Sequence, residues 1–271
     1  MDFHAEKVIA EEFMKFLMNG ALFQGSMPVM WSPVEKTALA DAEVEYEDHV
    51  SPTVHIGFPV TTPGPKSRLE AGDLIVIWTT TPWTLPENLA LCVGTKIEYA
   101  IVEDLESGDH LIFALERLGA YDKKLVDAMA KVGDGSGADL AGCAGDKYRF
   151  VRSVAANDLV GLHYEPLFPY FADQPNSFVV LQDGFVTTED GTGIVHIAPA
   201  YGEDDFRIGR AANIDLVDPL DEEARFKEPV TEYKGQGGKD ADKAIPKRFE
   251  DQGNLGHQTQ NLHTYPVVDA Q

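Results

Sequence analysis

Short runs of β-branched and other apolar residues, each closed by Pro, Gly or Asp, recur along most of this chain. Such runs are typical of β-strands, because branched side chains pack well on a pleated surface and turn residues end each strand. The pattern predicts strands at residues 44–47, 53–58, 74–78, 98–102, 111–115, 177–181, 185–188 and 193–198.

Helical spacing of apolar residues occurs at fewer places. It predicts helices at residues 3–18, 121–132, 203–212 and 239–252, the last interrupted by Pro246. Glycine-rich or Pro-rich punctuation predicts loops at residues 64–68, 133–137 and 141–145. The sum is an α+β fold with a strand-rich, barrel-like mixed β core and peripheral helices. A closed or curled sheet of this kind is favoured over a βαβ array.

The charge balance is strongly acidic, with 22 Lys and Arg against 45 Asp and Glu in 271 residues, a formal net charge of −23. A surface this acidic repels phosphate backbones, which excludes a broad non-specific grip on nucleic acid. A local basic patch, or a neighbouring domain that holds the nucleic acid, stays open.

The two cysteines, Cys92 and Cys143, are far apart and cannot build a disulfide framework or a zinc knuckle. The first residues lack the basic and apolar regions of a signal peptide. The longest uncharged run, residues 74–86, is too short and too polar to span a bilayer. These features predict a cytoplasmic protein without a membrane partner.

Four threonines, two tryptophans and two prolines lie within residues 78–88, at the end of a predicted apolar strand. Strand alternation puts Thr79 and Thr81 on one face and Thr80 on the other. Hydroxyls both donate and accept hydrogen bonds, so the pair suits a polar ligand or a positioned water. The alternative is that threonine simply suits a strand and that Trp83 belongs to the core.

A second unusual segment, residues 190–206, contains a histidine in a predicted strand and a run of acids that opens a predicted helix. His196 shares a strand face with Ile194 and Ala198. Asp205 follows nine residues later, at the helix start, so the two side chains can close one pocket. Alternatively, His196 is a hydrogen-bonded core residue and Asp205 only complements the helix dipole.

Both segments resemble the two editing-pocket motifs of the connective-peptide editing domain inserted into isoleucyl-tRNA synthetase, a class I aminoacyl-tRNA synthetase. Supporting matches lie at residues 31–46, 161–168 and 263–266. Valyl and leucyl relatives carry a TTRP-type string instead, which favours the isoleucyl assignment. The resemblance implies the fold of the valyl, isoleucyl and leucyl editing domains. It divides the chain into an N-terminal helical segment (1–24), an editing domain (25–266) and a tail (267–271).

Synthetases of this class also need HIGH and KMSKS signatures at their ATP site, and this sequence contains neither. Residues 55–58 are a near match, but they lie within a predicted strand before Pro59 rather than at the start of a helix. The chain is therefore expected to be unable to activate an amino acid. Ser32 follows Trp31 where cysteines occur in the wider group, so the resemblance implies no metal and no cofactor.

The resemblance also implies a role for individual residues. Asp205 matches the carboxylate that pairs with the α-ammonium of the substrate, and Thr79 and Thr81 match the hydroxyls that order the attacking water. His196 matches the residue that excludes the larger isoleucine side chain. Further substrate-binding residues are predicted at Thr80, Trp83, Asn88, Gly193 and Asp204.

The implied activity is hydrolysis of mischarged valyl-tRNA(Ile), with valyl-adenylate as an additional substrate left open. Isoleucyl enzymes themselves illustrate that a hydrophobic pocket distinguishes one methylene by only about 1–3 kcal/mol, which makes a second sieve necessary. Neither motif holds a serine or cysteine nucleophile beside a base, so we expect direct attack by water. The expected partners are the valine-bearing 3′ end of tRNA(Ile) and the rest of the synthetase, the chain itself being a monomer.

Two alternatives remain at this stage. One is a non-catalytic module that binds tRNA ends or partner proteins, against which the intact set of pocket residues argues. The other is a metal hydrolase that uses His196, Asp204 and Asp205, although their spacing matches no recognised ligand pattern and hard cations prefer more oxygens. Whether His196 acts as a general base stays open.

Overall fold

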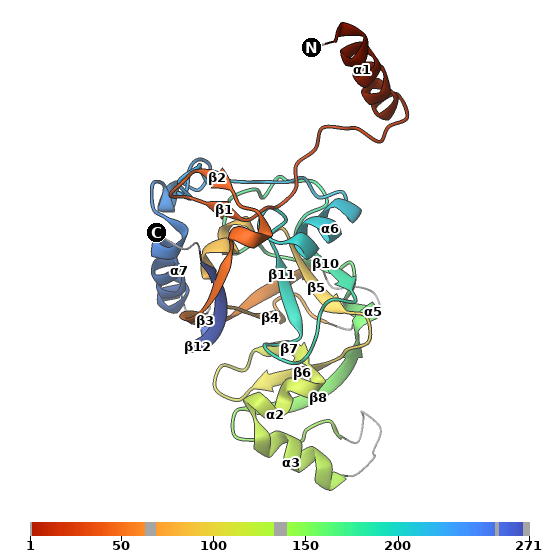
Figure 1. The fold of residues 1–271 in the computed structure, drawn as a ribbon. Coiled ribbons are helices and arrows are strands. Elements are labelled where there is room, and N and C mark those ends of the chain that lie inside the picture. Colours follow the sequence, from red (N-terminus) through yellow and green to blue (C-terminus); the bar gives the residue numbers. More distant parts are fainter. Residues whose placement is uncertain (1, 63–68, 133–139, 253–254, 268–271) are drawn as a thin grey trace.

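The computed structural model describes residues 2–62, 69–132, 140–252 and 255–267 (Figure 1). Its strands are β1 (Trp31–Ser32), β2 (Thr37–Ala38), β3 (Glu45–Thr62), β4 (Leu74–Thr79), β5 (Ala90–Gly94), β6 (Glu98–Asp104), β7 (His110–Ala114), β8 (Tyr148–Ala155), β9 (His163–Tyr164), β10 (Val179–Asp183), β11 (Ile194–Ile197) and β12 (Leu255–Val267). Its α-helices are α1 (Phe3–Met18), α2 (Leu118–Tyr121), α3 (Lys123–Val132), α5 (Ala156–Leu159), α6 (Glu203–Ala211) and α7 (Gly238–Gln252). Short 3₁₀ helices are η1 (Asp41–Glu43), η2 (Pro82–Glu87), η3 (Leu115–Arg117) and η4 (Thr231–Tyr233).

Apart from the small β1–β2 pair, the described strands form one mixed sheet with the order β11-β5-β10-β9-β3-β4-β7-β6-β8, and β12 adds to β3. The β5–β10 and β4–β7 pairs are parallel, whereas the other neighbouring pairs are antiparallel. Strand β3 is the longest. It pairs with β12 and β4 along most of its length and with β9 at its end, so it joins the two halves of the sheet.

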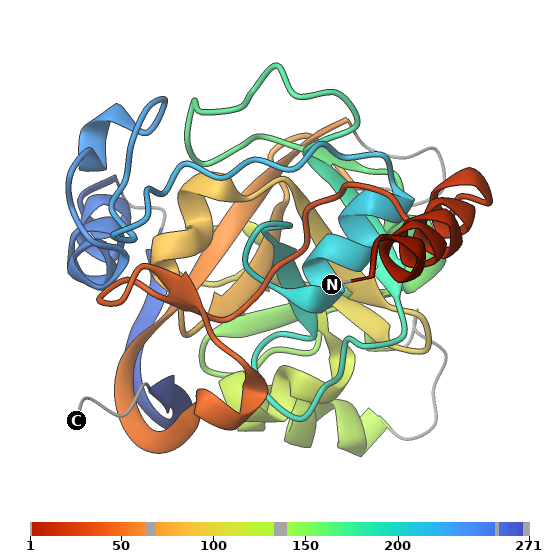
Figure 2. The same ribbon diagram turned by 45° about the horizontal axis from the view of Figure 1, so that its top comes forward.

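The sheet curls until β11, at one end of the strand order, lies against β4. Side chains from β3, β4 and β5 fill the interior of this curl, among them Ile56, Phe58, Ile77 and Leu91, each fully buried. Helices α6 and α7 lie outside the sheet, and α2 and α3 lie below it (Figures 1 and 2). This arrangement confirms the predicted α+β class with a barrel-like mixed core and peripheral helices.

A second, smaller core lies between strands β6, β7 and β8 and the helices α2 and α3. Phe113 and Phe150 from the strands pack there with Leu118 and Leu125 from the helices. The Phe113 and Tyr121 rings pack edge to face at a centroid distance of 5.1 Å. This packing fixes the segment 115–121, which lies next to the loop that precedes β11 (Figure 1).

The predicted N-terminal helix is confirmed as α1, which projects away from the rest of the molecule (Figure 1). None of its residues is buried, and apolar side chains such as Phe3 and Phe13 are exposed. The division of the chain at residues 24 and 266 stays a prediction. None of the helices in the described ranges is long and apolar enough to cross a membrane.

The predicted strand at 185–188 is wrong, because these residues form turns and irregular backbone between β10 and β11. The Thr188 carbonyl accepts a hydrogen bond from an arginine side chain rather than from a neighbouring strand. The other predicted strands are confirmed within a few residues, with 44–47 and 53–58 joined in β3. The predicted loops at 64–68 and 133–137 lie wholly or mostly outside the described residues.

The predicted interruption at Pro246 is also wrong, since α7 runs through this residue. Proline has no N–H to donate to the carbonyl four residues earlier and normally ends or bends a helix. Here Ala241, Ile245 and Phe249 lie one helical turn apart and are fully buried against the core. Burial of this face compensates for the missing hydrogen bond.

Strands β5, β8 and β12 had no counterpart in the sequence prediction. Strand β12 lies in a polar segment and pairs with β3 from Glu45 to Ile56, with one irregularity near Leu255. Backbone pairing to an existing strand needs no apolar alternation, so the sequence pattern carries no signal for it.

Glu87, at the end of η2, is the least expected residue of the interior. It is 1% exposed, and neither carboxyl oxygen has a hydrogen-bond partner in the described chain. Burial raises its pKa well above the usual value, and the nearby Asp218 raises it further. The folded protein therefore holds a proton that the unfolded chain releases above about pH 4.5, so stability falls as the pH rises above this value.

The variant Glu87→Met is expected to raise the free energy of unfolding at pH 7.5 by about 1–3 kcal/mol, the usual cost of an unsatisfied buried polar group. It should also reduce the loss of stability between pH 5 and pH 7.5. Urea denaturation at both pH values measures this. Glu98→Met, at an exposed position on β6, is the matched control. Equal pH dependence in the wild type and Glu87→Met would contradict the prediction.

Candidate active site

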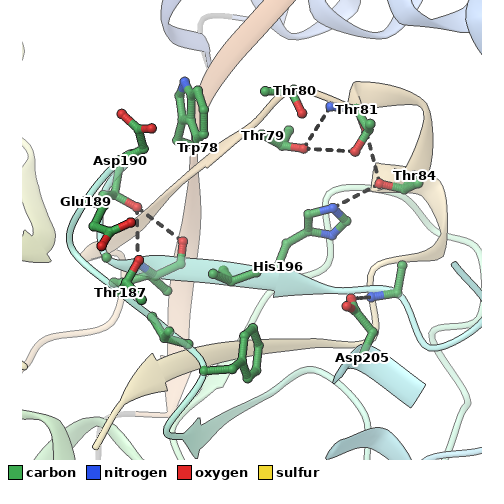
Figure 3. A pocket seen from close by; sticks show the side chains of 18 of the residues that line it. Trp78, Thr79, Thr80, Thr81, Thr84, Thr187, Glu189, Asp190, His196 and Asp205 are labelled. Carbon is green, nitrogen blue, oxygen red and sulfur yellow. Dashed lines mark hydrogen bonds between the residues drawn. The ribbon is translucent and has the colours of Figure 1, made fainter. Parts of the chain in front are cut away.

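A cavity of about 450 Å³ opens between the end of β4, the strand β11 and the start of α6 (Figure 3). The curl of the sheet creates it, because β4 and β11 come together there without pairing. The lining residues are 78–81, Thr84, 185–187, 189–196, Ala198, Tyr201 and Asp205. Both sequence motifs therefore line one cavity.

The two threonine hydroxyls at the end of β4 lie side by side, as strand alternation predicts. Thr79 Oγ1 is 3.3 Å from Thr81 Oγ1 and accepts a hydrogen bond from the Thr81 N–H at 3.1 Å. Pro82 begins η2 directly afterwards, so Thr81 is the residue before a helical turn. Its hydroxyl stays with Thr79 instead of capping that turn. The pair presents two adjacent groups that can each hold a water or a polar ligand.

Thr84, one turn later, connects this segment to the histidine on β11. Its hydroxyl donates to the Thr81 carbonyl at 2.9 Å and lies 2.9 Å from His196 Nε2 (Figure 3). A hydroxyl has one proton, and a carbonyl can only accept, so both bonds form only if His196 Nε2 carries the imidazole proton. This assigns the tautomer and leaves the lone pair on His196 Nδ1, which has no partner in the described chain.

His196 is a neutral wall of the cavity. It is 8% exposed, and burial lowers the pKa of its imidazole to about 4. The ring is therefore uncharged at neutral pH and presents a rigid, fixed surface rather than a cation. A ring held by a hydrogen bond at its far nitrogen cannot swing aside without breaking that bond.

Asp205 faces the cavity from the first turn of α6 (Figure 3). Its Oδ1 accepts a hydrogen bond from the Ala198 N–H at 2.8 Å. A Cβ at Gly202 would lie 2.3 Å from Asp205 Oδ2, so only glycine allows the carboxylate this position. Burial raises the pKa of Asp205, the Ala198 bond opposes the rise, and Asp204 adds to it. A cation bound in the cavity would relieve this desolvation.

The cavity is electrostatically one-sided. Glu189, Asp190 and Asp205 line it, and none of the lining residues is Lys or Arg. Trp78 and Phe185 add flat apolar surfaces. The arrangement suits a ligand that combines a positively charged group with a small apolar part.

The cavity brings together six of the nine predicted site residues: Thr79, Thr80, Thr81, Gly193, His196 and Asp205. Trp83, Asn88 and Asp204 do not line it. Asn88 is buried behind it, where its amide donates to the Ala90 carbonyl at 2.9 Å and accepts from the Tyr164 hydroxyl at 2.6 Å. These bonds serve the packing of η2 against the sheet.

Trp83 and Asp204 each neighbour a residue that lines the cavity. The Trp83 ring packs edge-on against Tyr201, a lining residue, at a centroid distance of 5.0 Å. The exposed Asp204 carboxylate pairs with Arg207 at 2.9 Å. Its position argues against a metal site built from His196, Asp204 and Asp205. The described residues contain no group of three or more His, Cys, Asp or Glu arranged to hold a metal ion.

Sequence reasoning missed Thr84, Tyr201, Glu189 and Asp190 as lining residues. Thr84 had a signal, because it follows Thr81 by three residues after a proline that favours a helical turn. Tyr201 sits between the two motif residues His196 and Asp205, but nothing in its spacing separates it from its neighbours. The acidic pair belongs to the loop that the strand prediction at 185–188 misassigned in part.

Residues 1–246 match the family described as tRNA synthetases class I (I, L, M and V). The chain belongs to this family. Isoleucine–tRNA ligases are similar to this class I synthetase chain: the ligase of Treponema denticola is 38% identical over 92% of the chain, and that of Corynebacterium efficiens is 36% identical over 98%. The cytoplasmic isoleucine–tRNA ligase of Caenorhabditis elegans is 35% identical over 94%.

The class I synthetase chain spans 23%, 25% and 21% of the length of these three ligases. Its fold is similar to that in the crystal structure of GlLeuRS-CP1, with a TM-score of 0.50 and 14% identity. The similarity covers 77% of this chain and 99% of the other. At 14% identity this similarity concerns the fold alone, and it supports the α+β fold class.

The assigned tautomer makes a prediction about Thr84. In Thr84→Val, the buried His196 Nε2–H and the Thr81 carbonyl each lose a partner, which is expected to lower the free energy of unfolding by about 1–3 kcal/mol. In the wild type and in Thr84→Ser, which keeps the hydroxyl, ¹⁵N NMR of labelled histidine should show the Nε2–H form of His196, and Thr84→Ser should keep the stability of the wild type. An Nδ1–H imidazole in the wild type would refute the assignment.

Proposed function

We propose that this chain is the editing domain of an isoleucyl-tRNA synthetase and hydrolyses the ester of valyl-tRNA(Ile). The observation that carries the proposal is that Thr79, Thr81, His196 and Asp205, from two distant motifs, line one cavity. The similarity to isoleucine–tRNA ligases and the fold shared with GlLeuRS-CP1 support the same assignment.

Recognition begins with the α-ammonium of the aminoacyl group, which binds to the Asp205 carboxylate. A charge-assisted hydrogen bond at a half-buried carboxylate rewards a free amino group and disfavours blocked ones. The apolar side chain of valine then lies toward His196. Because the imidazole is held by Thr84, the additional methylene of isoleucine meets a wall that does not move.

Hydrolysis proceeds by direct attack of water on the ester carbonyl. A water held by the Thr79 and Thr81 hydroxyls bonds to the acyl carbon, and the bond from that carbon to the ribose oxygen breaks. The proton that the water releases goes to this ribose oxygen. Positioning of the water supplies much of the acceleration. A pKa near 4 makes His196 a weak base at neutral pH, so its main role is steric.

An acyl-enzyme on Thr84 is disfavoured, although Thr84 and His196 lie within hydrogen-bond distance. The Thr84 proton is directed at the Thr81 carbonyl, and the nitrogen nearest to Thr84 carries a proton of its own. An activated nucleophile needs the reverse arrangement, with a lone pair on that nitrogen. Thr84 is also buried, at 5% exposure.

Delivery of the tRNA belongs to the rest of the synthetase. With a formal charge of −23 and an acidic cavity, the chain repels phosphates, and its own grip on tRNA should weaken steeply with salt. Valyl-adenylate, a smaller substrate, needs no such delivery. We place the protein in the cytoplasm, the compartment named for the isoleucine–tRNA ligase of Caenorhabditis elegans.

Asp205→Ala is expected to reduce deacylation of valyl-tRNA(Ile) by about 10- to 100-fold, since hydrogen bonds to charged groups contribute about 1.5–3 kcal/mol. The assay uses the purified chain at low salt. The matched control is Glu203→Ala, at an exposed position in the same helical turn, which should retain full activity. Full activity in Asp205→Ala would remove the ammonium anchor. If the wild type deacylates no tRNA, valyl-adenylate hydrolysis distinguishes missing delivery from a silent binding module.

His196→Ala is expected to open the cavity to isoleucine. The ratio of valyl- to isoleucyl-tRNA(Ile) deacylation should fall by about 10- to 100-fold, because the steric sieve for one methylene is lost. Parallel time courses with the two esters measure the ratio. If discrimination is unchanged, another residue sets the size limit.

A further inference from the structure

The outer wall of the cavity is the loop between β10 and β11, residues 184–193. It contributes Glu189, Asp190 and Gly191 to the lining but has no partner strand in the described sheet. Gly191 and Gly193 have φ angles of +64° and +72°, which side chains rarely adopt. Glycine adopts these angles without strain, and hydrogen bonds from outside the loop hold its backbone in place.

Arg117, at the end of η3, supplies three of these contacts, more than any other single residue of the described chain. Its Nε donates to the Gly191 carbonyl at 2.8 Å, and its Nη1 donates to the carbonyls of Thr188 at 3.2 Å and Glu189 at 2.9 Å. Arg117 does not line the cavity and lies in neither motif. A planar guanidinium that is always charged can hold three carbonyls in a fixed geometry, which lysine cannot do.

Tyr121, one turn later in α2, donates to the same Gly191 carbonyl at 2.9 Å. Its hydroxyl also lies 3.0 Å from His55 Nε2 on β3, and the two rings meet edge to face. Burial raises the pKa of this hydroxyl to about 12, so it stays a donor at neutral pH. The loop is thus tied both to the second core and to the central strand.

The position of the loop matters for the motif on β4. A Cβ added at Gly191 would lie 2.9 Å from the Trp78 ring, so the loop backbone presses directly on the residue before Thr79. A shift of the loop would therefore move the outer wall of the cavity and also remove the contact that holds the Trp78 ring.

We propose that Arg117, supported by Tyr121, is a positioning residue that holds the 188–191 backbone against Trp78 and so keeps the outer wall of the cavity in its binding shape. This inference rests on the proposed function for its kinetic consequence, whereas its structural consequence stands alone. Loss of the clamp enlarges and loosens the wall that faces the substrate, while Thr79, Thr81, His196 and Asp205 keep their own bonds. The wall affects binding more than the chemical step.

Arg117→Met is the test, with Arg149→Met as the matched control, because the exposed Arg149 lies on β8 and pairs with Glu103 instead. In Arg117→Met, amide hydrogen exchange of residues 185–193 should quicken about 10-fold, with exchange in β4 and β5 unchanged. The KM for valyl-tRNA(Ile) should rise about 10-fold, with kcat within about threefold. Tyr121→Phe should change both in the same direction, by less, and Arg149→Met should change neither.

Unchanged exchange of the loop in Arg117→Met would overturn the proposal, as would equal acceleration in β4 and β5, which indicates general destabilisation. A lower kcat with unchanged KM would also overturn it. Arg117→Lys retains the charge and is the milder substitution. It should give an exchange rate of the loop between those of the wild type and Arg117→Met, because an ammonium cannot bond all three carbonyls. If the wild type hydrolyses neither valyl-tRNA(Ile) nor valyl-adenylate, the proposed function fails, and the exchange measurement still decides the clamp.

Discussion

The hydrogen bond between Thr84 and His196 joins residues that are 112 positions apart in the sequence and closes the inner end of the cavity. It forms only because the sheet curls far enough to bring β11 against β4, two strands that share no backbone hydrogen bonds. The fully buried residues of β3, β4 and β5 hold that curl. The same bond fixes the tautomer of His196, so the tertiary fold determines the chemical state of the residue that we propose limits the size of the ligand.

Much of the fold was predictable because the β-branched runs and the amphipathic helices are visible locally. The exceptions follow from interactions that local patterns cannot contain. Strand β12 depends on pairing with β3, and the helix α7 passes Pro246 because its apolar face is buried. In the segment 185–188, the Thr188 carbonyl bonds to an arginine instead of a strand. In each case a tertiary contact decides between conformations that the local sequence leaves nearly equal.

The candidate site shows the same division. Thr79, Thr81, His196 and Asp205 line the cavity because strand alternation and the helix start determine where they point. Asn88 does not line it, because the turn of η2 directs its amide to Ala90 and Tyr164. Closeness in sequence to the threonines therefore does not by itself predict which residues after Pro82 line the cavity. The role of Arg117 could not be predicted from the sequence. Its partners are backbone carbonyls about 70 residues away, and every residue has a backbone carbonyl.

The charge of the cavity determines which part of the proposed substrate it can bind. Every charged residue that lines the cavity is acidic, and the nearby Arg117 directs its donors to loop carbonyls rather than into the cavity. Such a cavity attracts an ammonium group and repels a phosphate, so it can recognise the charged end of an aminoacyl group but not the nucleic acid that carries it. Under the proposed function, selectivity for the amino acid and affinity for the tRNA come from different parts of the protein. If this chain acts within a larger synthetase, its acidity prevents unproductive binding of tRNA and admits only those ends that the rest of the enzyme presents.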